Sequence, residues 1–111
     1  MKRKREGEYI VAQNESVQIR IERRGINLPA SVALDGNSAQ SADGKLYVLR
    51  ITGNEVSHAV VTAAFPFDAP DDAAYQIFVE EPGGQSFEDR TIEKSDDPVT
   101  WQHDIRFIIG Q

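Results

Sequence analysis

The sequence predicts an all-β protein, and within that class an antiparallel β-sandwich of seven to eight strands. Runs rich in β-branched and aromatic residues recur at intervals of about ten residues, as they do in sandwich domains. Glycine, proline, asparagine and aspartate lie between these runs and supply turn signals. No stretch holds apolar side chains at helical spacing over three turns, so the pattern favours strands throughout.

The chain has 111 residues, enough to bury a core as one domain without a disulfide or a structural metal. We expect a single β-sandwich domain over residues 8–111. Residues 1–7 include a run of four basic side chains and are expected to form a disordered basic arm. Cysteine is absent, which excludes disulfides, thiolate catalysis and cysteine-ligated zinc.

The first third of the chain contains the clearest sign of an antiparallel sheet. Residues 8–13 form the first expected strand and residues 16–23 the second, in which apolar and polar side chains alternate. Such alternation is typical of a strand with one buried and one solvated face. Residues 30–34 continue the pattern weakly.

Two Asp-Gly pairs follow, Asp35-Gly36 and Asp43-Gly44. Each suits a type I′ turn, in which both central residues adopt positive φ. The segment between them, residues 37–42, is small and polar. We expect either a short edge strand or a loop there.

Residues 45–52 and 57–65 flank a short polar segment with glycine and asparagine, which is the pattern of a β-hairpin. Three apolar residues share one face of the first run, and Leu46 and Val48 make its other face apolar too. A strand that is apolar on both faces is typical of the interior of a sheet. We therefore expect this hairpin at the centre of the fold.

The last three expected strands are residues 75–81, 86–93 and 99–109. Pro82 and Gly83 suit the second and third positions of a type II turn between the first two. The run 86–93 is the most polar of the three and is expected at a sheet edge. The run 99–109 keeps apolar side chains at every second residue, which predicts a long half-buried strand.

In strand count and spacing the chain resembles the immunoglobulin-type sandwiches, and an immunoglobulin-like or jelly-roll-like arrangement is expected, with a small β-barrel as the alternative. The Cys-Trp-Cys pattern of immunoglobulin domains is absent, and Trp101 lies near the end of the chain. This resemblance concerns architecture and implies nothing about function.

The net charge of −6 is unevenly distributed. Residues 1–54 carry nine Lys or Arg and six Asp or Glu, a balance of +3, whereas residues 55–111 carry three and twelve, a balance of −9. An acidic domain repels a phosphate backbone, which argues against nucleic acid as a partner. No run is long enough to span a membrane and no signal peptide is recognised, so a soluble, cytoplasmic protein is expected.

Acidic loops are the first candidate site. Asp68, Asp71 and Asp72 lie in one connection, and Asp96 and Asp97 lie in another. Alternate connections of a sandwich emerge at the same end, so these carboxylates could converge on Ca²⁺, which takes six to eight oxygen ligands. The spacing matches no EF-hand, and acidic loops commonly serve solubility.

The two histidines give little support to an enzyme. His103 shares an apolar strand face, where a histidine is expected to be a core residue with a satisfied hydrogen bond. His58, His103 and Asp104 would make a sparse metal site, and neighbours on a strand such as His103 and Asp104 point to opposite faces. No nucleophile motif or phosphate loop is present. We therefore expect a protein that is not an enzyme.

Two aromatic residues are candidates for a contact patch. Phe67 lies in a proline-rich connection, and Phe78 lies on the polar face of its strand, where it is either an exposed contact residue or a core residue beneath a second covering layer. The sequence thus predicts a non-catalytic module for protein–protein interaction or self-association, with a protein partner or a homo-oligomer bound through an exposed edge strand. The alternative is a calcium-dependent or carbohydrate-binding module that uses the acidic loops, and no other cofactor is expected.

Overall fold

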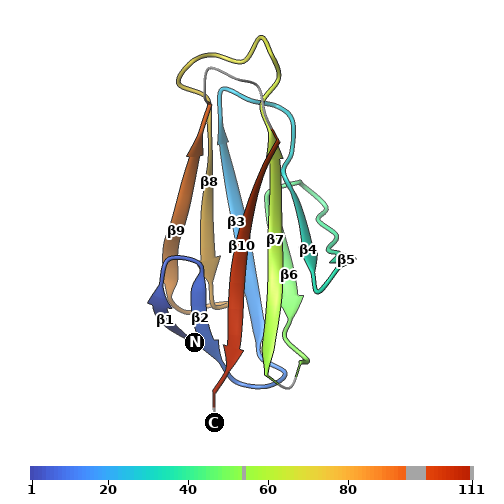
Figure 1. Cartoon of the computed structure of the whole chain (residues 1–111), viewed down its shortest axis with the longest axis vertical. Coiled ribbons are helices and arrows are strands. Elements are labelled where there is room, and N and C mark those ends of the chain that lie inside the picture. The colour runs from blue at the N-terminus through green and yellow to red at the C-terminus, as the bar shows by residue number, and fades with distance from the viewer. Residues whose placement is uncertain (54, 95–99, 111) are drawn as a thin grey trace.

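The computed structural model describes residues 1–53, 55–94 and 100–110, in which it places ten β-strands (Figure 1). In chain order they are β1 (Lys2–Arg5), β2 (Glu8–Val11), β3 (Ser16–Arg24), β4 (Ser31–Leu34), β5 (Asn37–Ser38), β6 (Leu46–Arg50), β7 (Val56–Ala64), β8 (Ala74–Glu80), β9 (Ser86–Glu93) and β10 (Thr100–Ile109). These residues contain no helix, and hence none that could cross a membrane.

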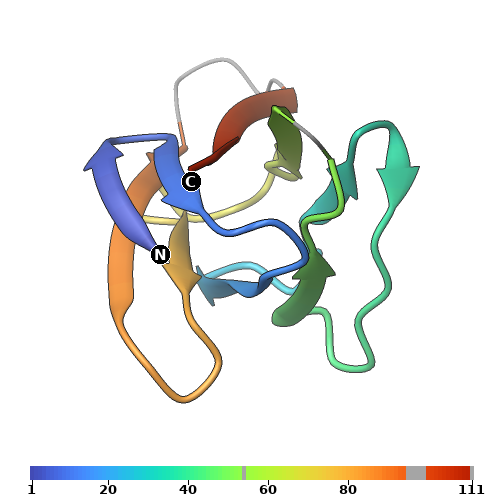
Figure 2. The same ribbon diagram turned by 90° about the horizontal axis from the view of Figure 1, so that it is seen from below.

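The strands form two sheets that pack as two layers, as the view along the strands in Figure 2 shows. One sheet has the order β1-β2-β10-β7-β4-β5 and the other the order β6-β3-β8-β9. The predicted β-sandwich is confirmed, and neither sheet closes on itself as a barrel would. All strand pairs are antiparallel except β2 and β10, which run parallel, so the larger sheet is mixed. The short strand β1 was not expected, whereas β5 is the short edge strand that was one of the two expectations for residues 37–42.

The core lies between the layers and is built by side chains that alternate along the strands. Its largest fully buried members are Tyr9, Tyr75, Phe107, Ile19, Ile21, Ile51, Ile77, Ile105, Val17, Val32, Val61 and Val79. All except Ile51, which follows β6, lie on strands of the two sheets, so burial of these apolar surfaces is what joins the two layers.

The expected hairpin of residues 45–65 is wrong. Strand β6 pairs with β3 in the four-stranded sheet, whereas β7 pairs with β10 and β4 in the other sheet. The short connection between them crosses from one layer to the other. A sandwich corner and a hairpin share the same local turn signals, and the long register of nine residue pairs between β7 and β10 decides between them.

The expected central position of residues 45–52 is also wrong, because β6 is an edge strand. Its inner face, with Tyr47 and Leu49, is buried. Its outer face is not covered by a second layer, and Leu46 and Val48 are exposed there. The apolar side chains of this outer face are therefore not explained by burial in the interior of a sheet.

Residues 1–7 differ from the expected disordered arm, because Lys2–Arg5 forms β1 and pairs with β2. The chain reverses at Gly7, whose φ of 72° favours glycine. Ion pairs from Lys4 and Arg5 to Glu8 then offset part of the basic charge of the hairpin.

Two of the three predicted turn types are confirmed. Asp35 and Gly36 both have positive φ and join β4 to β5, as a type I′ turn requires. The turn at Pro82 closes with a hydrogen bond from the Gly84 N–H to the Glu81 carbonyl oxygen, and Gly83 has the positive φ of a type II turn. Asp43-Gly44 is not a type I′ turn, because only its glycine has positive φ.

Candidate interaction surface

Strand β6 combines an anchored inner face with an open outer face. The Tyr47 hydroxyl donates a hydrogen bond of 2.6 Å to the Ala30 carbonyl oxygen in the opposite layer, which fixes β6 against the core. On the outer face the exposed fractions are 36% for Leu46 and 59% for Val48, and Arg50 is exposed as well. The strand therefore presents apolar side chains on a backbone that is held by β3 and by the Tyr47 hydrogen bond.

The backbone of β6 is paired with another strand on one side only. The Ile21 N–H donates to the Lys45 carbonyl oxygen and the Ile51 N–H donates to the Glu15 carbonyl oxygen, which sets the ladder with β3. In an antiparallel pair the groups of every second residue point to the partner strand and those between point away. The N–H and C=O groups of Val48 and Arg50 therefore point away from β3.

Within the described residues, the outward N–H and C=O groups of Val48 and Arg50 have no hydrogen-bond partner. The Leu46 N–H differs, because it donates to the Asp43 carboxylate, as does the Lys45 N–H. These two bonds lower the pKa of Asp43. They fix the point at which β6 begins, so the unpaired edge starts beyond Leu46.

A groove with a volume of about 430 Å³ lies beside the start of β6. It is lined by Arg20, Glu22, Arg23, Ile26, Asn27 and Lys45. Three of these six side chains are cationic and one is anionic. The groove is thus a locally basic site on a protein of net charge −6.

The two predicted contact aromatics do not form one patch. Phe67 has an exposed fraction of 85% and lies in the connection between β7 and β8. Phe78 is the fifth residue of β8, about 13 Å along the strand from its start at about 3.3 Å per residue. The Arg20 guanidinium lies 4.1 Å from the centre of the Phe78 ring and partly covers it.

Of the predicted calcium ligands, Asp68, Asp71 and Asp72 are exposed in the connection between β7 and β8, whereas Asp96 and Asp97 lie outside the described residues. The parts of the chain that the structure describes contain no group of three acidic or histidine side chains arranged to hold a metal ion.

Lys94 lies against the same connection. Its ammonium group donates hydrogen bonds to the carbonyl oxygens of Phe67 and Ala69, and its backbone N–H donates to the Ala73 carbonyl oxygen. These contacts bring the end of β9 to the loop that holds Asp68, as expected for alternate connections. They also place a positive charge beside the loop, which disfavours a cation there.

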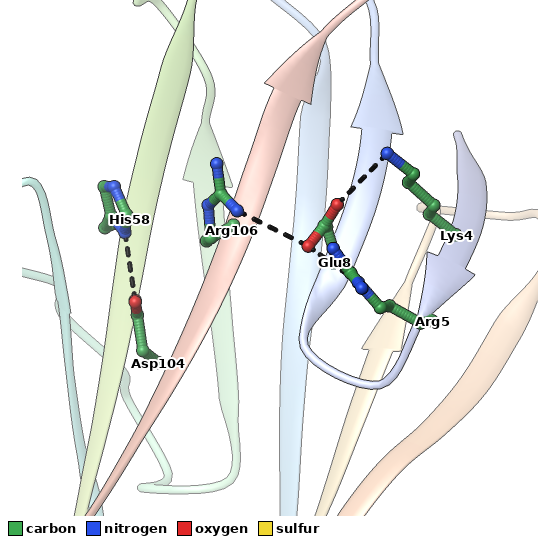
Figure 3. Close-up of polar contacts among 6 residues, drawn as sticks. All are labelled: Lys4, Arg5, Glu8, His58, Asp104 and Arg106. Carbon is green, nitrogen blue, oxygen red and sulfur yellow. Dashed lines mark hydrogen bonds and ion pairs between the residues drawn. The ribbon is translucent and has the colours of Figure 1, made fainter.

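The outer face of the six-stranded sheet carries a row of paired charges, shown in Figure 3. Glu8 on β2 is surrounded by Lys4, Arg5 and Arg106, and the hydrogen bond from Arg5 is the main reason that its pKa is lowered. Further along the row, His58 Nδ1 lies 3.1 Å from an Asp104 carboxylate oxygen. Because each carboxylate is already paired, this row fits a role in holding adjacent strands together.

His103 does not join His58, because it points into the sandwich. Its Nε2 lies 2.5 Å from the Asp89 carboxylate, which also accepts hydrogen bonds from the Tyr9 hydroxyl at 2.5 Å and the Gly7 N–H at 2.7 Å. Both His103 and Asp89 are buried. The expectation that His103 is a satisfied core residue is confirmed.

The sequence analysis did not identify the Asp89 network, because Asp89 lies in the polar run 86–93 that was expected at a sheet edge. Between the pairs Phe78–Glu88 and Ile77–Arg90 the register shifts, and Asp89 has no partner on β8. This bulge turns Asp89 inward, while Glu88 remains exposed. The only sequence signal for the network was that Asp89 lies two residues after Phe87, so that both side chains face the same side of the strand.

Comparison with known proteins gave no match to any family model, to any curated protein or to any solved structure.

Proposed function

We propose that this chain is a non-catalytic β-sandwich module that binds a protein partner by adding an extended segment of that partner to the outer edge of β6. The observation that carries the proposal is the unpaired N–H and C=O groups of Val48 and Arg50 beside an exposed Val48 side chain. An incoming strand would satisfy the backbone groups and cover the apolar side chain at once.

The titratable groups support a binding role better than a catalytic one. Both histidines are paired with aspartate, and neither lines the groove beside β6. His103 is buried, so a substrate would have to open the core to reach it. Catalysis by a general base requires a group within hydrogen-bond reach of a bound substrate.

Proline at position 48 tests the proposal without removing a ladder bond. Because the Val48 N–H points away from β3, Val48→Pro removes an outward donor and leaves the pairing with β3 intact. Val48→Thr is the matched control, since it keeps the donor and the branched shape. Thermal melts and circular dichroism of both variants would establish that the sandwich is retained.

The wild-type chain and both variants are immobilised, exposed to an extract of the source organism, and the bound proteins are quantified. We expect a partner that is retained by the wild type and by Val48→Thr and lost with Val48→Pro. That partner is then purified and titrated against the three chains. Equal affinity for Val48→Pro and Val48→Thr would show that binding does not use the β6 edge.

A further inference from the structure

Cations flank the open edge of β6, and no carboxylate of the described residues forms an ion pair with them. Lys45 precedes the strand, Arg50 ends it, and Arg23 lines the groove at the Lys45 end. The Arg23 guanidinium donates to a backbone carbonyl, that of Asn27. None of the three lies within ion-pair distance of a described carboxylate.

Arg20 lines the same groove, and its positive charge is neutralised by ion pairs with carboxylates. It donates to both Glu80 oxygens, contacts Glu22, and stacks on the Phe78 ring. Its charge is therefore balanced by neighbours on the outer face of the sheet. Arg23, Lys45 and Arg50 form no such side-chain ion pair with a described carboxylate, and the Asp43 carboxylate near Lys45 accepts backbone N–H groups of β6 and of Lys45.

We propose that the segment bound by β6 is acidic: an extended peptide with an apolar residue opposite Val48 and carboxylates on both sides of it. The inference rests on the strand addition proposed above and names the chemistry of the partner. Strand pairing puts the residue two positions from the apolar one on the same face, where it lies opposite Arg50. At the other end, a carboxylate reaches Lys45 and Arg23 in the groove.

A second copy of this chain is the less suitable occupant. Antiparallel pairing of two β6 strands about Val48 would place Arg50 of one copy opposite Leu46 of the other. Lys45 of that second copy is the next residue along the chain, so Arg50 would approach a second cation as well as the Asp43 carboxylate that binds the Leu46 N–H, whereas an acidic peptide brings no added cation. Charge complementarity therefore favours a different, acidic chain.

The test uses a short synthetic peptide in which threonine alternates with aspartate except for one valine at the centre. A second peptide has asparagine at every aspartate position, and a third has lysine there. Each is labelled and titrated against the full chain at low and at high salt. The protein variants are Arg23→Glu/Lys45→Glu/Arg50→Glu, Val48→Pro and Val48→Thr.

We expect the aspartate peptide to bind about tenfold more tightly than the asparagine peptide at low salt, since it makes about three exposed ion pairs. The lysine peptide should bind more weakly still. High salt should reduce the advantage of aspartate. The triple charge reversal should invert the preference and favour the lysine peptide.

Two failures can be told apart. If all three peptides bind equally and Val48→Pro abolishes binding, strand addition stands and the acidic preference is overturned. If the aspartate peptide binds Val48→Pro and Val48→Thr equally well, binding does not use the β6 backbone and strand addition fails too. Displacement of the peptide from both variants by a single-stranded oligonucleotide would show that the cations attract any anion.

Absence of binding by any peptide at millimolar concentration would overturn the proposed occupant. Sedimentation of the protein alone gives the remaining outcome. A dimer of the wild type that dissociates with Val48→Pro would make a second copy the occupant of β6, in place of an acidic peptide.

Discussion

Strands β6 and β9 are the two edges of the same four-stranded sheet, and they present different chemistry to a neighbouring chain. The outward side chains of β6 are Leu46, Val48 and Arg50, and its register with β3 is unbroken. Strand β9 exposes Glu88 and carries a bulge at Asp89. Charges and bulges are the common means by which proteins protect a sheet edge.

The two edges also differ in how they are attached to the other layer. The bulge on β9 directs Asp89 to Tyr9 and His103, so this edge is tied to the six-stranded sheet by a buried polar network. Strand β6 is attached to the other layer through the Tyr47 hydroxyl, and its outer side is left unpaired. Both strands end the sheet, but β9 carries a bulge and a buried polar network, whereas the register of β6 with its only neighbour is regular.

The largest expected effect on stability concerns Asp89 at the β9 edge. Asp89→Ala removes the acceptor of three hydrogen bonds and leaves their donors buried, so we expect a loss of about 3–5 kcal/mol in the free energy of unfolding. Urea unfolding monitored by fluorescence measures it. Glu88→Ala is the exposed control one residue away and should change stability by about 0.5 kcal/mol or less. Similar losses in the two variants would refute the network.

Proline substitutions should distinguish the inner and outer sides of β6. Leu49→Pro removes a ladder donor to β3 and a buried side chain, and we expect it to cost about 3 kcal/mol or more. Val48→Pro removes only an outward donor and should cost about 1 kcal/mol or less. The difference between the two denaturation midpoints is the measurement. Equal losses would mean that Val48 also bonds within the fold.

The same comparison shows what the sequence could and could not predict. The turn at Asp35-Gly36 was predicted correctly, because a two-residue turn depends on local backbone preference. The position of β6 was not, because a strand that is apolar on both faces, as Leu46 and Val48 make this one, can be a buried central strand or an exposed edge strand. Only the pairing with β3, distant in sequence, separates the two.

The sequence predicted the kind of surface but not the residues that form it. An exposed edge strand was expected, but the contact residues proposed from sequence were Phe67 and Phe78. Phe78 is partly covered by Arg20, an interaction between two strands that sequence spacing does not reveal. Asp89 was likewise overlooked, since a bulge depends on register with the neighbouring strand.

A smaller effect is expected on acidification. Burial raises the pKa of Asp89, but hydrogen bonds from His103, Tyr9 and Gly7 outweigh it and leave the pKa below its usual value of 3.8. A carboxyl with a lowered folded-state pKa contributes stability above 3.8 that is lost as pH falls through the folded-state pKa. The wild type should lose stability more steeply than Asp89→Asn below that value. Parallel curves from urea titrations would contradict this.

The smallest expected effect concerns the acidic loop. Millimolar Ca²⁺ should leave the thermal midpoint unchanged relative to EDTA, because Lys94 lies beside the loop that holds Asp68, Asp71 and Asp72. A calcium site occupied at a hundred times its dissociation constant would instead add about 2.7 kcal/mol. A rise of that size, lost in Asp71→Ala, would favour the calcium-dependent module over the edge-binding one.

Amide hydrogen exchange at β6 tests the central claim most directly. In the free protein the Val48 and Arg50 amides should exchange rapidly, while those of Tyr47 and Leu49 are protected by the ladder with β3. Saturation with the aspartate peptide should slow exchange at Val48 and Arg50 and leave Tyr47 and Leu49 as they were. Protection of the Val48 amide in the free protein, or no change on peptide binding, would contradict an open edge that accepts a partner strand.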